Sequence, residues 1–481
     1  MKKLRVKHIV TVLLIFILYI ILGCLIPFMR PQKVSDSFQA SFNAEAFYQM
    51  PGVKEVDRAE LVEGSMDALT SRIRMIHQAK ERIVLSTFDI RTGESCNDIF
   101  ASLLAAADRG VKVQVLVDGL YGSVHMNGEP VFYVLGEHPN VEIRFYNIPS
   151  LLKPWTIHGR MHDKYLLIDD QLVLMGGRNT FDYFLGEYNM KNLSYDRDVL
   201  IYNTEYGNGQ ENGSAVWQVD SYFQDMWSSP YCESVFQKPS SSMEKKLPQA
   251  EADLRRHYEE MAAVFGEYMA DGYDYAPDTT AIHKATLIWN PTHPLAKEPW
   301  IWYQLCELMK QADERVYLHT PYAVFSRDMY EGMKETAEKV PDFKMLLNSV
   351  AIGDNFMASS DYIYNKEKIL ETGVTIYEYN GDHSSHGKSM LIDHDLSLIG
   401  SYNLDMRSTY VDTETMLVIH GEEFNRLLEE RILEMEKEAV LIRPDGTPDP
   451  ETAGLKKEVP TGKKILFFIT SRLFQLFHYL I

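Results

Sequence analysis

A short pattern of five residues occurs twice in this chain and constrains its fold more than any other feature. Each copy has a histidine, a lysine, an aspartate, a glycine and an asparagine, and both copies have the same internal spacing. The residues are His162, Lys164, Asp169, Gly176 and Asn179 in the first copy, and His386, Lys388, Asp393, Gly400 and Asn403 in the second. Two matches in different halves of the chain predict a duplicated fold. Each half would contribute one histidine, one lysine and one asparagine to a shared site.

These residue types suit phosphoryl transfer. One imidazole can attack phosphorus and hold the phosphoryl group covalently, while a second protonates the departing oxygen and deprotonates the incoming one. Lysines and asparagine amides stabilise charge on the non-bridging oxygens. Residues two apart on a strand point to the same face. Because the apolar runs 165–168 and 390–392 are typical of buried strands, each histidine and its lysine can project into one cleft.

The alternatives for a single motif are less specific. A lone His-X-Lys is usually an exposed strand face, but its repetition at identical spacing favours a functional site. A metal site would need a different spacing. The chain has no HExxH or CxxC pattern, and a lysine follows each motif histidine, where it would repel a divalent cation. We therefore expect neither a metal nor another cofactor.

The duplication extends to the segments before each motif. Three pairs of apolar runs correspond, namely 82–85 with 315–318, 113–118 with 345–348, and 141–147 with 374–380. Helical apolar spacing separates the first two runs in each half, around 99–107 and 329–337. This order of strands and helices predicts the α/β class, with an α/β sandwich in each half.

The two motifs, together with 176–179, 320–322 and 400–408, resemble those of the phospholipase D superfamily, and in particular of bacterial cardiolipin synthases. The resemblance covers 79–418. It implies two phospholipase D-like lobes that share one active site, and a metal-independent, two-step mechanism through a phosphohistidine. The catalytic residues that it implies are His162, Lys164, Asp169, Asn179, His386, Lys388, Asp393 and Asn403, with Asp169 and Asp393 possible supports of the fold.

The resemblance also implies supporting residues. A carboxylate downstream of each motif should orient an imidazole, and Asp198 and Glu414 occupy those places. Many family members have serine where this chain has Gly177, so a hydroxyl that helps to bind phosphate would come from Ser401 alone. By analogy with the family, His162 is expected to be the nucleophile and His386 the acid and base.

The expected function is a phosphatidyl transfer from one phospholipid to phosphatidylglycerol, which makes cardiolipin. The partners would be phosphatidylglycerol, a second phospholipid and the membrane. A phospholipase D that uses water, a nuclease of the same superfamily and a non-enzymatic scaffold are the alternatives. The formal net charge of −20 disfavours a nuclease, because sequence-independent binding of nucleic acid needs a broad basic surface.

The amino terminus predicts a membrane anchor, 1–29. Four basic residues precede the uncharged run 9–29, which is long enough to cross the hydrocarbon core. A cleaved signal peptide fits less well, because the run is long and no A-x-A site follows. The positive-inside tendency places the amino terminus in the cytoplasm and the catalytic part outside a bacterial cell membrane.

The rest of the chain divides by composition. We expect a polar stalk at 30–60, the first lobe at 61–237, a helical connector at 238–282, the second lobe at 283–440 and a linker at 441–460. The last segment, 461–481, combines lysines and an arginine with several phenylalanines, which is typical of an amphipathic helix on the membrane surface. A terminal helix that docks on the protein core is the alternative.

Overall fold

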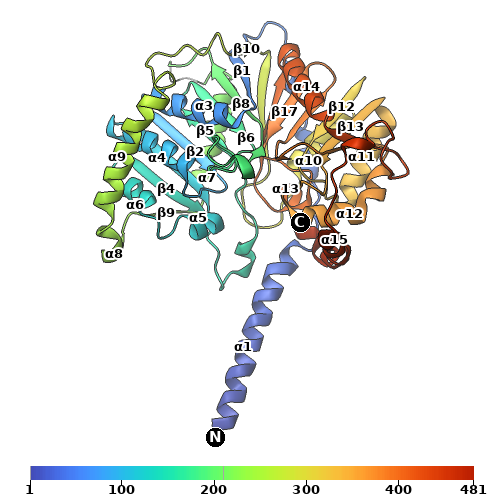
Figure 1. Ribbon diagram of the computed structural model, residues 1–481, viewed down its shortest axis with the longest axis horizontal. Coiled ribbons are helices and arrows are strands. Elements are labelled where there is room, and N and C mark those ends of the chain that lie inside the picture. The colour runs from blue at the N-terminus through green and yellow to red at the C-terminus, as the bar shows by residue number, and fades with distance from the viewer. Residues whose placement is uncertain (1, 208, 210) are drawn as a thin grey trace.

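The computed structural model describes residues 2–207, 209 and 211–481, and within them it contains two large mixed sheets, one in each half of the chain (Figure 1). The first has the order β10 (Thr280–Ala281), β1 (Asp57–Val62), β8 (Asp198–Asn203), β6 (Leu172–Gly176), β5 (Tyr165–Ile168), β2 (Arg82–Thr87), β3 (Lys112–Asp118), β4 (Val141–Tyr146), β9 (Cys232–Val235). The second has the order β11 (Lys284–Trp289), β18 (Thr415–His420), β17 (Leu396–Gly400), β16 (Ser389–Ile392), β12 (Arg315–His319), β13 (Asp342–Asn348), β14 (Thr375–Tyr379), β19 (Ala439–Ile442).

The two orders correspond strand for strand once β10 is set aside. In both sheets a parallel trio, β2-β3-β4 or β12-β13-β14, is flanked by antiparallel strands. The predicted duplication and the α/β class are therefore confirmed. The motif histidines and lysines lie just before β5 and β16 rather than inside a strand.

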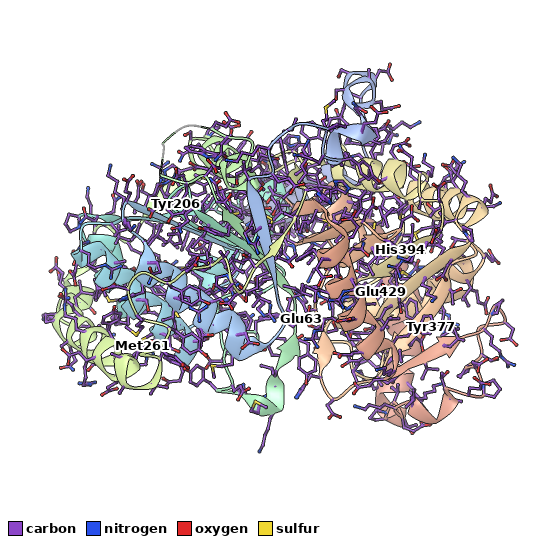
Figure 2. The ribbon with its side chains drawn as sticks, turned by 90° about the horizontal axis from the view of Figure 1, so that it is seen from above. Glu63, Tyr206, Met261, Tyr377, His394 and Glu429 are labelled. Carbon is purple, nitrogen blue, oxygen red and sulfur yellow. The ribbon has the colours of Figure 1, made fainter. Side chains whose placement is uncertain are left out.

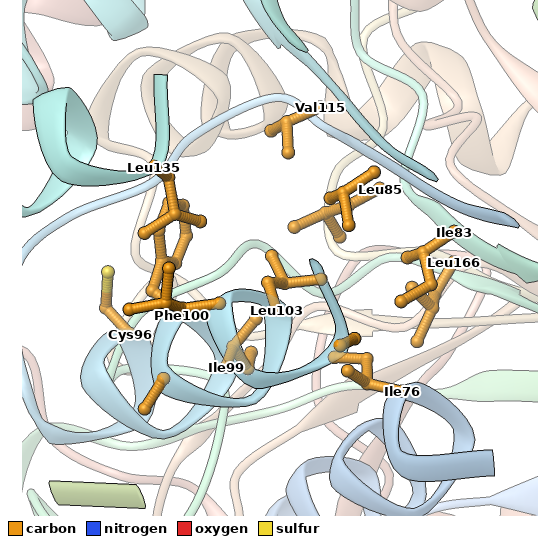
Figure 3. Close-up of a cluster of buried hydrophobic side chains, with 14 of the residues drawn as sticks. Ile76, Ile83, Leu85, Cys96, Ile99, Phe100, Leu103, Val115, Leu135 and Leu166 are labelled. Carbon is orange, nitrogen blue, oxygen red and sulfur yellow. The ribbon is translucent and has the colours of Figure 1, made fainter. Parts of the chain in front are cut away.

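Helices cover the outer face of each sheet. In the first lobe these are α3 (Ser65–Gln78), α4 (Glu94–Asp108), α5 (Gly119–His125), α6 (Pro130–Glu137) and α9 (Leu247–Val264), with the short α8 (Ser241–Glu244) before α9. In the second they are α10 (Trp300–Met309), α11 (Arg327–Lys339) and α12 (Phe356–Leu370), and the short α13 (Met406–Tyr410) packs on α10. Figure 3 shows how α4 buries Ile99, Phe100 and Leu103 opposite Leu85 and Val115 of the sheet. This burial supplies the main stabilisation of the lobe.

The inner faces of the two sheets share one core. Val173 and Val199 of the first lobe cluster with Leu417 and Ile419 of the second, and helices α7 (Ala215–Trp227) and α14 (Glu422–Glu436) complete the cluster. Seen from above, Glu63 lies at the boundary between the lobes, with Met261 and Glu429 to either side (Figure 2). The lobes are thus packed against each other over a buried apolar surface.

The segments outside the lobes are less separate than the sequence suggested. Within the predicted stalk, 30–60, helix α2 (Asp36–Ser41) and the segment up to Phe47 lie on the second lobe, where Phe47 enters the core and Phe38 stacks on Trp300 at 4.7 Å. Residues 57–60 already belong to β1 of the first sheet. A polar stalk was therefore wrong, because its aromatic residues find apolar partners. The connector also joins the first lobe, since Leu254 of α9 is buried in its core.

Helix α1 leaves the body at the end where the carboxy terminus lies (Figure 1). Helix α1 (Lys2–Leu25) contains most of an apolar stretch, Lys7–Phe28. This stretch has a mean hydropathy of 3.2 and is long enough to cross a membrane. Helix α15 (Thr461–Leu473) and the 3-10 helix η6 (Phe474–Leu480) dock on α12, where Phe467 stacks on Phe356 at 4.8 Å. The tail therefore docks on the second lobe with one face and exposes apolar residues on the other.

The motif aspartates hold the start of β2 and of β12 in place. Asp169 accepts hydrogen bonds from the backbone amides of Lys80, Glu81 and Arg82, at 3.0, 2.9 and 2.7 Å. Asp393 does the same for 313–315, at 3.0, 2.9 and 3.0 Å. Both aspartates adopt positive φ, 51° and 47°. These carboxylates face the chain before β2 and β12 instead of the histidines, which favours the second expectation for them, support of the fold.

We predict that Asp169→Ala lowers the free energy of unfolding by about 1–3 kcal/mol, because three amides lose their acceptor. Activity per folded molecule should be kept. Denaturant unfolding and specific activity measure the two effects. Asp170→Ala is the matched control, since among the described residues the Asp170 carboxylate accepts one hydrogen bond, from the backbone amide of Gly207. A stable but inactive Asp169→Ala variant would return this residue to the catalytic group.

Candidate active site

The two motif histidines are each held by a carboxylate from the opposite lobe. His162 Nδ1 lies 2.8 Å from Glu414 Oε1, and His386 Nδ1 lies 2.7 Å from Asp196 Oδ2. Backbone hydrogen bonds cross between the lobes in the same way. The amide of His162 donates to the carbonyl of Thr413, and the amide of His386 donates to the carbonyl of Tyr195. Each histidine therefore contacts the carboxylate and the carbonyl immediately before it in the other half of the molecule.

The carboxylate beside His386 is Asp196, and not Asp198 as expected from the sequence. Asp198 forms ion pairs with Arg72 at 3.0 Å and with Arg178 at 3.1 Å in the first lobe. The strand register explains the error. Gly176 pairs with Asp198 where Gly400 pairs with Met416, so the counterpart of Glu414 is two residues before Asp198.

Two further residues help to position the histidines by binding the backbone amide of the preceding residue, and sequence reasoning missed them. Asp118 accepts a hydrogen bond from the amide of Met161 at 3.0 Å, and Asn348 accepts one from the amide of Ser385 at 2.8 Å. Both residues end a corresponding strand, β3 or β13, and both clamp the residue before a histidine. The polar residue at the end of each of these repeated runs was the available signal.

Ser401 supports Glu414 and does not face the cleft as a phosphate ligand. Its hydroxyl donates to Glu414 Oε2 at 2.5 Å, and Ser408 donates to Oε1 at 2.6 Å. Gly177, at the same place in the first lobe, lies against Asp196, where an added Cβ would fall 2.3 Å from Oδ1. The glycine therefore leaves room for the carboxylate, and the two halves fix their carboxylates differently.

Both motif lysines are buried and bend back toward their histidines. Lys164 Nζ donates to the carbonyl of His162 at 2.5 Å, and Lys388 Nζ lies 2.7 Å from His386 Nδ1. Burial lowers the pKa of Lys164 to about 7, with Glu414 opposing the shift and Lys388 adding to it. Burial also lowers the pKa of Lys388, against the pull of Asp196. Two cations thus lie beside the two imidazoles.

The two carboxylates differ in their electrostatic environment. Burial would raise the pKa of Asp196, but Lys388, His386 and Arg178 reverse the effect and lower it below its ordinary value. Burial raises the pKa of Glu414 well above its ordinary value, although Lys164 and two serine hydroxyls oppose this. Burial lowers the pKa of both histidines, and Lys388 adds to the shift in each. Asp196 is therefore the carboxylate best suited to stabilise a protonated imidazole.

The asparagines complete the cluster at an aromatic cleft. The side-chain oxygens of Asn179 and Asn403 are buried and accept no hydrogen bond from the described residues. Asn179 lines a cleft of about 750 Å³ between the lobes. Its aromatic walls approach the histidines, because Phe88 lies 4.9 Å from His162 and Phe184 lies 5.0 Å from His386, centroid to centroid.

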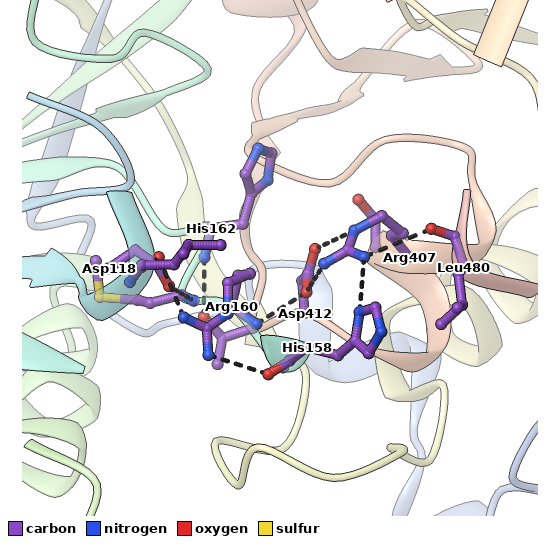
Figure 4. Close-up of polar contacts among 12 residues, drawn as sticks. Asp118, His158, Arg160, His162, Arg407, Asp412 and Leu480 are labelled. Atoms are coloured by element: carbon purple, nitrogen blue, oxygen red, sulfur yellow. Dashed lines mark hydrogen bonds and ion pairs between the residues drawn. The ribbon is translucent and has the colours of Figure 1, made fainter. Parts of the chain in front are cut away.

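A polar network next to His162 joins the two lobes (Figure 4). The amide of Arg160 donates to Asp412 Oδ1 at 2.9 Å, and Arg407 donates to both oxygens of the same carboxylate. Arg160 also places its guanidinium 3.4 Å from Asp118. The first-lobe segment before His162 is thereby joined to the second-lobe segment before Glu414.

The cluster contains what a two-step phosphoryl transfer needs. It has two oriented imidazoles, two adjacent lysine side chains and two asparagine amides, whose NH₂ groups can donate to phosphate oxygens. Among the described residues, no group of three His, Cys, Asp or Glu side chains could hold a metal ion. Charge stabilisation at this site would come from the lysines and amides.

Comparisons with known proteins identify the family of this chain. The family model described as "Cardiolipin synthase, PLD-like domain" matches residues 72–227 and 305–435. Cardiolipin synthase C of Escherichia coli (strain K12) is 27% identical over 79% of this chain and 84% of its own length. Cardiolipin synthase B of Salmonella typhi is 26% identical over 79% and 81%.

The fold also has a solved counterpart. The crystal structure of phosphatidylserine synthase from Haemophilus influenzae Rd KW20 superposes with a TM-score of 0.60 at 17% identity, over 89% of this chain and 97% of that one. The family model covers most of both lobes and all ten of their motif residues. This chain therefore belongs to the cardiolipin synthase-like branch of the phospholipase D superfamily.

Proposed function

We propose that this protein is a phosphatidyltransferase that makes cardiolipin, moving a phosphatidyl group from a phospholipid to phosphatidylglycerol through a phosphohistidine. The observation that carries the proposal is the crossed pairing of His162 with Glu414 and of His386 with Asp196. In each imidazole a carboxylate holds Nδ1; Nε2 of His162 has no hydrogen-bond partner among the described residues, and Nε2 of His386 lies 3.1 Å from Lys388 Nζ. The cardiolipin synthases among the relatives supply the substrate class.

In the first step, His162 Nε2 attacks the phosphorus of the donor lipid. A nitrogen–phosphorus bond forms, and the bond between phosphorus and the departing headgroup oxygen breaks. His386 supplies a proton to that oxygen, and the lowered pKa of Asp196 keeps a negative charge beside the imidazolium. Lys164, Lys388 and the two asparagine amides stabilise the non-bridging oxygens.

In the second step, neutral His386 accepts the proton of a hydroxyl of phosphatidylglycerol. The freed oxygen attacks phosphorus, the nitrogen–phosphorus bond breaks and His162 is regenerated. The acceptor decides the product, since water in place of phosphatidylglycerol would give phosphatidic acid. The protein would work at a cell membrane, with the amino terminus in the cytoplasm and the catalytic body on the opposite side.

Incubation of the purified protein with defined lipids tests the proposal. We expect phosphatidylglycerol with a second phospholipid to give cardiolipin, identified by mass spectrometry, in the presence of EDTA. His162→Ala and His386→Ala should each abolish turnover, because the two residues act as one unit. His394→Ala is the matched control, since His394 is exposed on a turn of the second lobe.

Other products would contradict the assignment. Phosphatidic acid without cardiolipin would indicate a phospholipase D, and cleavage of DNA or RNA would indicate a nuclease. Loss of turnover with EDTA and its rescue by a metal ion would contradict the role given to the lysines.

The correction from Asp198 to Asp196 gives a paired prediction. Asp196→Asn should lower kcat by about 10²–10⁴-fold while the protein stays folded, because His386 loses the charge that supports its acid role. Asp198→Asn should mainly destabilise, by about 3–5 kcal/mol, because Arg72 and Arg178 lose a buried partner. Steady-state kinetics and thermal unfolding separate the two. Near-normal kcat in Asp196→Asn would contradict the proposed role.

The pH dependence follows from Lys164, whose pKa is lowered to about 7. A lysine is charged below its pKa, so the cation is lost as pH rises through this value. We expect kcat/KM, which reports the free enzyme, to fall above about pH 7, and kcat to fall at higher pH because bound phosphate favours the cation. Lys164→Arg should move the alkaline fall of kcat/KM to higher pH. An unchanged fall in this variant would assign it to another group.

A further inference from the structure

A loop of the first lobe lies along the apolar helix α1. The loop 148–158 follows β4 and includes the 3-10 helix η3 (Pro154–Ile157). Tyr19 of α1 donates a hydrogen bond to the carbonyl of Leu152 at 2.8 Å. The approach is close, since a Cβ on Gly23 would fall 2.3 Å from Pro154 Cγ. The loop is therefore packed against the helix.

The contact lies well inside the apolar stretch of α1. Tyr19 comes nine residues before Phe28, where the stretch Lys7–Phe28 ends. At a rise of about 1.5 Å per residue, this is roughly 14 Å along the helix. The hydrocarbon core of a bilayer is about 30 Å thick. If α1 crosses a bilayer, the loop that Tyr19 contacts enters the same hydrocarbon layer.

The loop has an apolar tip and paired backbone groups, as a segment in the hydrocarbon layer requires. Leu151 and Leu152 at its tip are 66% and 74% exposed. Its backbone is largely satisfied internally, because Lys153 N donates to Ser150 O at 3.0 Å and Ser150 N donates to Thr156 Oγ1 at 2.9 Å. Unpaired backbone groups are costly in lipid. The one charge near the tip, Lys153, is exposed and has a long chain that can reach toward the headgroups.

The carboxy-terminal segment offers a second apolar surface at the same end of the body (Figure 1). Phe468 and Ile469 of α15 and Leu476 of η6 are 62%, 56% and 68% exposed. The opposite face of α15 docks on α12, through Phe467 and Phe356. Phe356 also lines the catalytic cleft. The rim of the cleft is thus adjacent to this apolar surface.

We propose that the loop 148–158 is a hairpin that inserts into the phospholipid bilayer beside α1, and that α15 with η6 rests on the same leaflet. The partner is the bilayer itself. Three apolar elements from distant parts of the chain then share one membrane-facing end. The cleft between Tyr121 and Phe356 opens beside that end, so a lipid headgroup reaches the histidines without leaving the leaflet. The insertion stands whether or not the proposed reaction is correct.

Tryptophan fluorescence in vesicles of phosphatidylcholine and phosphatidylglycerol tests the insertion. The full-length protein carries Leu152→Trp in one variant and Leu433→Trp in the control. Leu433 is 38% exposed on α14, away from α1 (Figure 1). Lipids brominated on the acyl chains should quench the added fluorescence of Leu152→Trp and leave that of Leu433→Trp unchanged.

Two results would overturn the inference. One is the absence of quenching in vesicle-bound Leu152→Trp, as in the Leu433→Trp control, which would place Leu152 outside the hydrocarbon. The other is a blue shift of Trp emission in Leu152→Trp that depends on protein concentration in detergent, which would make the partner a second copy of the chain.

A functional test is independent of the identity of the product. Leu151→Ser combined with Leu152→Ser should reduce turnover of vesicle lipid several-fold. Turnover of a short-chain phospholipid below its micellar concentration should be unchanged, since that substrate needs no bilayer. Leu433→Ser is the control. Equal losses on both substrates would show that the loop supports the fold, and would contradict insertion.

Discussion

The structure depends on the exchange of carboxylates between its two lobes. His162 needs Glu414 and His386 needs Asp196, so neither lobe holds a complete pair on its own. The exchange requires the lobes to meet in one fixed register. The shared apolar core of the two sheets, the pairing of β7 (Ser194–Tyr195) with β15 (Ser384–Ser385), and the hydrogen bond from Arg160 to Asp412 all maintain it. The packing between the lobes therefore also determines the geometry of the candidate active site.

The duplicated halves are similar in fold but unequal in chemistry. Glu414 is held by Ser401 and Ser408, whereas Asp196 lies against Gly177 and close to Lys388. As a result the pKa values of the two carboxylates move in opposite directions. Opposed shifts of this kind commonly separate acid and base roles in a site. The duplicated fold thus presents an asymmetric site, with His386 beside the carboxylate whose pKa is lowered.

The sequence predicted the repeated strands and the histidine, lysine and asparagine of each motif, because identical spacing in two halves reports one fold used twice. It placed the second carboxylate wrongly at Asp198, since only the strand register shows that Asp196 corresponds to Glu414. It also missed Asp118 and Asn348, which act through backbone amides. The stalk was misjudged because polar residues outnumber the few aromatic residues, such as Phe47, that dock on the second lobe.

The central claim is that one histidine of a shared pair carries the phosphatidyl group. Rapid quenching of the enzyme during turnover, followed by mass spectrometry of its peptides, tests this most directly. The account predicts a phosphatidyl adduct on the peptide that contains His162, and no adduct on the peptide that contains His386. An adduct on His386 would reverse the assigned roles. Turnover without an adduct on either histidine would contradict the covalent mechanism.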